Sequence, residues 1–229
     1  MPTAARVVAD LEERRDPPEL AKVRKRLAPD EPALGMRMGA LFDVAKTHTD
    51  LPLDEVHLLL DHPAYEPRMA AFCILDFKAR RRLQPDQREE LFRLYLERHD
   101  RITTWDMVDR SAPRVVGGYV SGRSPLPLFD LARAHGPLQR RTAITAPLYF
   151  VRAGSDEDLA AGFAVAELLA GDPEAVVYNA VGIFLKHAGS RDPHSLYRFL
   201  DRHSATMPRP GLRLATEKLP PADRARYRG

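Results

Sequence analysis

Apolar residues recur at helical spacing along nearly the whole chain. The segments 53–62 (LDEVHLLLDH), 88–99 (REELFRLYLERH) and 157–171 (EDLAAGFAVAELLAG) each place apolar residues three and four positions apart, as one face of an α-helix requires. No segment shows sustained alternation of apolar and polar residues together with strand-forming side chains. The pattern therefore predicts an all-α protein.

Local signals predict where some helices begin and end. Pro85 and Asp86 precede a run with acidic residues in its first turn, which predicts a helix start. Asp172 is the predicted N-cap of a later helix, with Pro173 at its first position. Gly189, like the glycine at 171, predicts a helix end.

The predicted helices come in pairs, and the second helix of each pair is the more apolar. These second helices are predicted to begin, at intervals of about 33–40 residues, near Tyr65, Trp105, Leu138, Glu174 and Pro208. A two-helix repeat cannot bury its own apolar face and must stack on its neighbours. The pattern favours a curved α-solenoid with the second helices on its concave face, and an irregular all-α bundle is the alternative.

The whole chain, residues 1–229, is expected to form one domain. The proline-rich stretch 28–35 (APDEPALG) predicts a loop between helices, and the last ten or so residues are expected to be a loosely attached tail.

Composition indicates a cytoplasmic protein. Cys73 is the only cysteine, so no disulfide can form within the chain. No apolar run approaches the roughly 20 residues of a membrane span, and the first residues become charged too soon for a secretory signal peptide. We expect a monomer without membrane contact.

Arginine supplies most of the 35 basic residues, and the net charge is +3 with a pI of about 9.1. Guanidinium groups match phosphate geometry, so this bias is compatible with a polyanionic partner, although arginine usage also follows genomic base composition. The arginine clusters at 24–26 and 80–82 are expected to be solvated helix faces. The eight histidines show no metal-ligand spacing, so no metal or other cofactor is predicted.

The sole tryptophan, Trp105, is followed by Asp106 and, one helical turn on, by Asp109. One interpretation is a core tryptophan next to an acid in the first turn of a helix. The other is a site for a cation, because residues 105 and 109 share one helix face and an indole ring attracts cations.

Several segments together resemble the AlkD-type DNA alkylation-repair glycosylases, which are built from HEAT-like helical repeats. WDMVDRSAP resembles the family signature WD-x-VD-x-x-x-P, and the other pieces agree with family motifs in order and spacing over roughly residues 10–218. The segments that carry the resemblance are ALGMR (33–37), HPAYEPRMAAFCIL (62–75), WDMVDRSAP (105–113), LQRRTAI (138–144) and AVGIFLKHA (180–188).

The resemblance implies roles for three residues. Asp109 takes the place of the catalytic carboxylate, Trp105 that of an indole packed against the damaged nucleotide, and Arg141 that of the arginine that holds the DNA backbone near the acid. The family commonly has a second tryptophan where this chain has Ile183, followed by Phe184, so both residues are expected near the lesion. Further DNA contacts are expected from Arg37, Arg140, Lys186 and Arg213.

The function implied is that of a monofunctional DNA glycosylase in base excision repair in the bacterial cytoplasm or nucleoid. Its substrate would be double-stranded DNA that carries positively charged N3- or N7-alkylpurines, such as 3-methyladenine or 7-methylguanine, and its product an abasic site. The absent second tryptophan leaves room for bulky adducts. No lysine lies near the motif, so no lyase step is expected. The alternatives are a non-catalytic protein that binds DNA structures and a protein-binding helical scaffold.

Overall fold

A computed structural model describes residues 2–228, which contain helices, turns and loops but no strand. The predicted all-α class is confirmed for this part of the chain. Its helices cluster in two compact units, one up to residue 111 and one from residue 112, whereas the sequence predicts a single domain. No helix among the described residues is long and apolar enough to cross a membrane.

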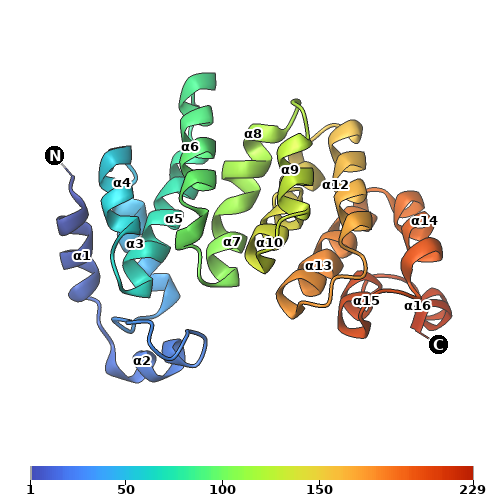
Figure 1. Cartoon of the computed structure of the whole chain (residues 1–229), viewed down its shortest axis with the longest axis horizontal. Coiled ribbons are helices and arrows are strands. Elements are labelled where there is room, and N and C mark those ends of the chain that lie inside the picture. Colours follow the sequence, from blue (N-terminus) through green and yellow to red (C-terminus); the bar gives the residue numbers. More distant parts are fainter. Residues whose placement is uncertain (1, 229) are drawn as a thin grey trace. The chain divides into compact units, whose positions relative to one another are not determined.

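The first unit is drawn in blue to green in Figure 1. Its helices are α1 (Ala4–Glu12), α2 (Pro17–Arg24), α3 (Met38–Thr47), α4 (Leu53–Leu60), α5 (Tyr65–Ala79), α6 (Pro85–Glu97), the 3-10 turn η1 (His99–Arg101) and α7 (Trp105–Ala112).

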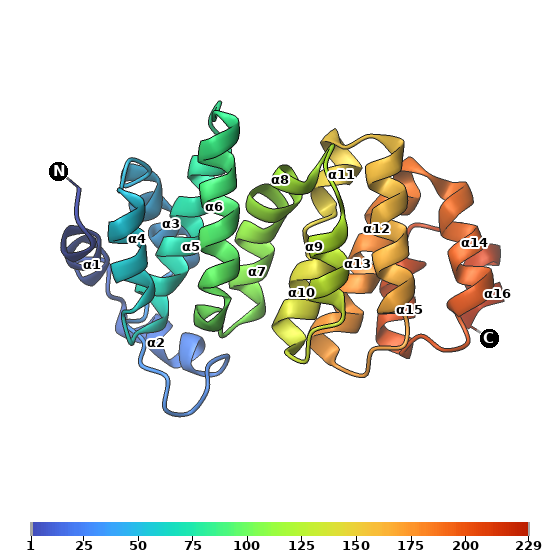
Figure 2. The same ribbon diagram turned by 45° about the horizontal axis from the view of Figure 1, so that its top comes forward.

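Helix α5 is the core of the first unit. It packs against α1, α3, α4 and α6, and Figure 2 shows it between α4 and α6. The side chains from Tyr65 to Asp76 are all buried, and Phe72 meets Tyr95 of α6 edge to face with ring centroids 5.8 Å apart. A helix that is buried on all sides is typical of a central element that other helices cover.

The buried carboxylate of Asp76 links α5 to α7. It has no solvent exposure, and it pairs with Arg80 at 2.7 Å and with Arg110 of α7 at 3.1 Å. The Arg110 guanidinium also lies over the rings of Phe42 and Phe77, at 4.3 and 4.7 Å from the centroids. Pairing compensates for the burial of this charge and fixes the last turn of α7.

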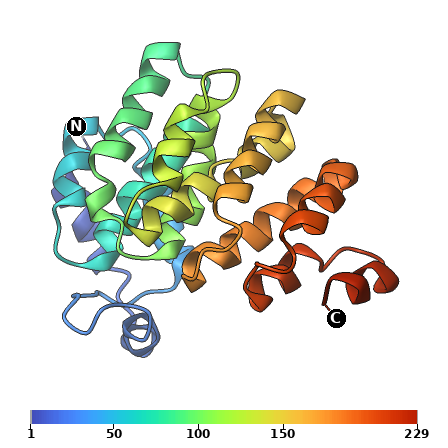
Figure 3. The ribbon, with the colours of Figure 1, turned by 45° about the vertical axis from the view of Figure 1, so that its right-hand side comes forward.

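The second unit is drawn from green to red in Figure 1, and α13 is its central helix, in contact with α10, α11, α12, α14 and α15. Figure 3 shows α16 beside α15 at the C-terminal end. The elements are the π-helical turn η2 (Pro113–Gly117), α8 (Gly118–Val120), α9 (Leu126–Ala132), α10 (Pro137–Thr145), α11 (Leu148–Ala153), α12 (Asp156–Leu168), α13 (Ala175–Arg191), α14 (Pro193–His203), α15 (Arg209–Ala215) and α16 (Pro221–Arg228).

The predicted second helices are present within the two units. Helices α5 and α7 begin at the predicted residues, and α10, α13 and α15 begin within one residue of them. Paired first helices pack on them, as in the pairs α4–α5, α9–α10 and α12–α13. The predicted loop at 28–35 is also confirmed, because residues 25–37 connect α2 to α3 without a helix.

Two predicted boundaries are wrong. Asp172 does not cap a helix that begins at Pro173, because α13 begins at Ala175 and the Asp172 carboxylate instead accepts a hydrogen bond from the backbone N–H of Glu174 at 3.0 Å. Gly189 does not end α13, which continues to Arg191. A Cβ at Gly189 would lie 2.9 Å from the Cβ of Leu196, so this glycine allows α14 to pack closely.

The C-terminal residues also differ from the expected loose tail. They form α16, in which Tyr227 is only 7% exposed and donates a hydrogen bond to Asp201 of α14 at 2.7 Å. Tyr197 of α14 donates a second hydrogen bond to Asp223. Two tyrosine–aspartate hydrogen bonds therefore hold the last helix on the second unit.

Candidate functional site

Helix α7 begins at Trp105 and presents two faces. Met107 and Ser111 lie on the buried face, and neither has solvent exposure. The Trp105 side chain is 45% exposed, and Asp109, one turn on, is half-buried. Because residues four apart lie on the same side of a helix, the indole and the carboxylate share one face. The exposure of Trp105 argues against its interpretation as a core residue.

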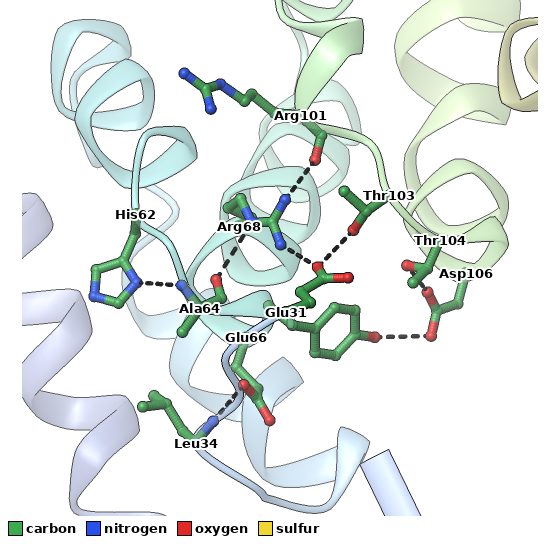
Figure 4. Close-up of polar contacts among 11 residues, drawn as sticks. Glu31, Leu34, His62, Ala64, Glu66, Arg68, Arg101, Thr103, Thr104 and Asp106 are labelled. Atoms are coloured by element: carbon green, nitrogen blue, oxygen red, sulfur yellow. Dashed lines mark hydrogen bonds and ion pairs between the residues drawn. The ribbon is translucent and has the colours of Figure 1, made fainter. Parts of the chain in front are cut away.

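Asp106 points to a different side of α7, where three donors surround its carboxylate. Its Oδ2 accepts hydrogen bonds from the Tyr65 hydroxyl at 2.8 Å and from Arg26 Nη1 at 2.9 Å. Its Oδ1 accepts one from Thr104 Oγ1 at 2.5 Å, as Figure 4 shows. Burial of Tyr65, and next the adjacent Asp106 charge, raise the pKa of the phenol well above its usual range, so its proton stays in the hydrogen bond.

Arg26 belongs to the connecting segment 25–37, which other carboxylates fix to the first unit. The Glu66 side chain, 1% exposed, accepts hydrogen bonds from the backbone N–H groups of Leu34 and Gly35, both at 2.8 Å. Gly35 has φ +81°, and a Cβ there would lie 2.5 Å from the Cβ of Leu20, so only glycine fits this turn.

Glu31 of the connecting segment is held on α5 and on the residues before α7. Its carboxylate pairs with Arg68 and accepts a hydrogen bond from Thr103 Oγ1 at 2.7 Å (Figure 4). Arg68 in turn donates to the backbone carbonyl of Arg101 at 3.4 Å. The connecting segment therefore contacts the residues directly before Trp105 as well as Asp106 after it.

In the second unit, Arg141 lies on α10 and is only 4% exposed. Its guanidinium donates a hydrogen bond to the backbone carbonyl of Val176 in the first turn of α13. Ile183 lies half-buried on α13. Phe184 has no solvent exposure and packs edge to face on Phe163, with centroids 5.7 Å apart, so its ring is part of the core of this unit and does not reach the surface.

The four residues expected to contact DNA lie in different surroundings. Arg37 is highly exposed, with a 77% exposed side chain, and Arg213 on α15 is also exposed. Lys186 pairs with Glu217 at 3.3 Å. The side chain of Arg140 is 16% exposed and binds Asp172 at 2.6 Å and the backbone carbonyl of His135 at 2.6 Å, so its guanidinium supports the loops next to α10 and α13.

A cavity of about 420 Å³ opens on the second unit, lined by η2, α11 and one residue of α13. Its basic members are Arg114, Arg152 and His187, and the remaining lining is mostly apolar. Burial lowers the pKa of His187, and the nearby charges of Lys218 and Lys186 lower it further. This concentration of basic side chains was not predicted from the sequence.

The arginine clusters expected to be solvated helix faces are partly paired. Arg26 binds Asp106, as described above, while Arg80 binds Asp76 and Arg81 binds Asp50. The partner of Arg26 lies 80 residues away in the sequence, and that of Tyr65 lies 41 residues away. Neither pairing leaves a local sequence signal. Among residues 2–228, no group of three or more His, Cys, Asp or Glu side chains is arranged to hold a metal ion.

The model of a protein family described as "DNA alkylation repair enzyme" matches residues 7–219. A solved structure described as a predicted DNA alkylation repair enzyme from Enterococcus faecalis superposes with a TM-score of 0.68 at 14% sequence identity, and covers 91% of this chain and 98% of its own. At this identity the likeness concerns the fold. No curated protein has a sequence that matches this chain significantly.

Proposed function

The chain belongs to the family of DNA alkylation repair enzymes, and on this premise we propose that it is a DNA glycosylase that removes positively charged alkylpurines from double-stranded DNA. The reaction is hydrolysis of the N-glycosidic bond of an N3- or N7-alkylated purine. Water adds to C1′ of the deoxyribose and releases one proton to solvent, and the alkylated base leaves with the bonding electrons, which neutralise its positive charge. The products are the free base and an abasic site.

The observation that carries this proposal is the shared face of Trp105 and Asp109 on α7. As the glycosidic bond breaks, positive charge develops on the sugar, and a fixed carboxylate stabilises that charge. The 45% exposed indole offers a π face to a cationic nucleotide one helical turn from the acid. Because the alkylated base is already a good leaving group, the reaction requires little general-acid catalysis.

Basic residues on both units support DNA as the partner. Arg37 on the first unit and Arg213 on the second are exposed, and the cavity of the second unit carries Arg114 and Arg152. Arg141 is a proposed contact with the DNA backbone, although its guanidinium also holds the start of α13. Guanidinium groups bind phosphates by paired hydrogen bonds and give binding that weakens with salt.

The half-buried Ile183 supports a substrate range that includes bulky adducts. Isoleucine is smaller than tryptophan and has no π face, so it provides neither a second aromatic contact with a developing cation nor a tight boundary around a small lesion. Phe184 does not replace that contact in this structure, because its ring is buried on Phe163.

The test is base release from alkylated duplex DNA by wild type and by Asp109→Asn. We expect the variant to lose about 100-fold or more in excision rate, because charge stabilisation is lost, while duplex affinity changes little. Asp43→Asn, at an exposed acid on α3 of the same unit, is the matched control and should retain wild-type excision. Wild-type excision by Asp109→Asn would contradict the mechanism. Duplex binding without base release by the wild-type protein would favour a non-catalytic DNA-binding protein instead.

A further inference from the structure

Asp106 is held more firmly than an ordinary acid in the first turn of a helix. Its side chain is 13% exposed and accepts three hydrogen bonds, from Tyr65, Arg26 and Thr104. A first-turn acid that only complements the helix dipole needs none of these partners. The donors come from three different places in the first unit: the core helix α5, the connecting segment 25–37 and the residue before α7.

These contacts fix the orientation of α7 about its own axis. Successive residues of a helix point about 100° apart, so fixing Asp106 on the inner side determines where Trp105 and Asp109 point. Tyr65 is 1% exposed and lies at the start of α5, which makes it an immobile donor. The pKa of its phenol is raised well above its usual range, first by burial and then by Asp106, so the donor keeps its proton at every working pH.

The connecting segment adds a second fixed point. Arg26 reaches Asp106 from a segment that Glu66 and Glu31 hold in place through Leu34, Gly35 and Arg68. The Arg26 guanidinium also lies 6.0 Å from the centre of the Tyr65 ring. The first turn of α7 is thus fixed from α5 and from the connecting segment. Figure 4 shows Tyr65 and Thr104 on Asp106 and, as a separate group, Arg68 and Thr103 on Glu31.

We propose that Asp106 is a positioning residue for the proposed active site: its hydrogen bonds to Tyr65, Arg26 and Thr104 set the direction in which α7 presents Trp105 and Asp109. Asp106 itself does not touch the substrate in this role. The expected effect on catalysis rests on the proposed function. The expected effect on the placement of Trp105 does not depend on it.

The experiment uses the full chain with Asp106→Ala and Asp106→Asn. Asp86→Ala is the matched control, because Asp86 is also the second residue of its helix, α6, but is exposed. The first readout is single-turnover excision of an alkylated base at saturating protein, together with duplex affinity. The second is acrylamide quenching of the tryptophan fluorescence, excited at a wavelength that tyrosine does not absorb, which reports on Trp105 alone because it is the sole tryptophan.

We expect Asp106→Ala to lower the excision rate about tenfold or more, since a misplacement of about 1 Å costs up to about 100-fold, while duplex affinity is unchanged. Its Trp105 quenching should differ from that of wild type. Asp106→Asn should be intermediate in both readouts, because its amide oxygen still accepts a hydrogen bond. Asp86→Ala should match wild type in both.

Wild-type excision together with wild-type quenching in Asp106→Ala would overturn the proposal. If that variant fails to fold, Tyr65→Phe and Arg26→Gln each remove one donor of the same carboxylate, and unchanged quenching in both would overturn it equally. If the wild-type protein releases no base, the proposed function fails. The quenching of Trp105 then still decides whether Asp106 positions it.

Discussion

Replacing Glu66 with Gln should release the connecting segment 25–37 locally. The Glu66 carboxylate is 1% exposed and accepts two backbone N–H groups, those of Leu34 and Gly35, at 2.8 Å each. A hydrogen bond to a charged group contributes about 1.5–3 kcal/mol, and an unsatisfied buried donor costs about 1–3 kcal/mol. The Gln side chain keeps one oxygen that can accept one of these two hydrogen bonds. Its NH₂ group faces the other backbone N–H, so the second hydrogen bond is lost and two donors face each other.

The expected cost is therefore about 4 kcal/mol in the local opening free energy of residues 30–37. Hydrogen exchange followed by mass spectrometry measures it: exchange in peptides that contain Leu34 and Gly35 should accelerate by up to about three orders of magnitude. Exchange in α13 of the second unit should not change. Glu90→Gln, at an exposed glutamate of α6, serves as the control. Wild-type exchange of residues 30–37 in Glu66→Gln would refute the assignment of Glu66 as the residue that holds this segment.

Two further predictions concern the substrate and pH. Ile183→Trp should raise excision of a methyl adduct by about 2- to 30-fold, the range of one cation–π contact, and should slow excision of a bulky adduct; unchanged rates for both would mean that position 183 only packs. Burial lowers the pKa of His99 to about 4, so between pH 6.5 and 4 the unfolded chain takes up a proton that the folded chain does not. The free energy of unfolding should thus fall by about 2–3 kcal/mol as the pH drops through this window, a loss that urea titrations should not find in His99→Gln.

The sequence predicted the helix boundaries correctly where neighbouring residues determine them. Helices α5 and α7 were predicted to begin near Tyr65 and Trp105 and begin at these residues, because apolar spacing and first-turn chemistry are properties of adjacent residues. The predicted boundaries were wrong where a residue distant in the sequence determines the local structure. Asp172 is engaged by Arg140, 32 residues away, and Gly189 is required by the close packing of Leu196 on α13.

The candidate site divides in the same way. The spacing of Trp105 and Asp109 is enough to place them on one helix face, since four residues make about one turn. The partners of Asp106 were not predicted. Tyr65 lies 41 and Arg26 lies 80 positions from Asp106, and no local sequence pattern indicates a contact over such separations. The burial of Phe184 was missed because its helix neighbour Ile183, one position earlier, lies half-exposed, and α13 is apolar on most of its sides.

The fully buried Asp76, which Arg110 and Arg80 share, restricts how this protein can evolve. Loss of Arg110 alone removes one of the two guanidinium groups that pair with the buried carboxylate, and loss of Asp76 alone leaves the Arg110 guanidinium between two phenyl rings without this anion. Removing one member of a buried ion pair costs about 3–5 kcal/mol, whereas exchanging the members together for apolar residues is often neutral. Positions 76 and 110 are therefore expected to change together in descendants of this sequence. A change from the ion pair to an apolar pair by single substitutions would pass through an intermediate protein that folds poorly.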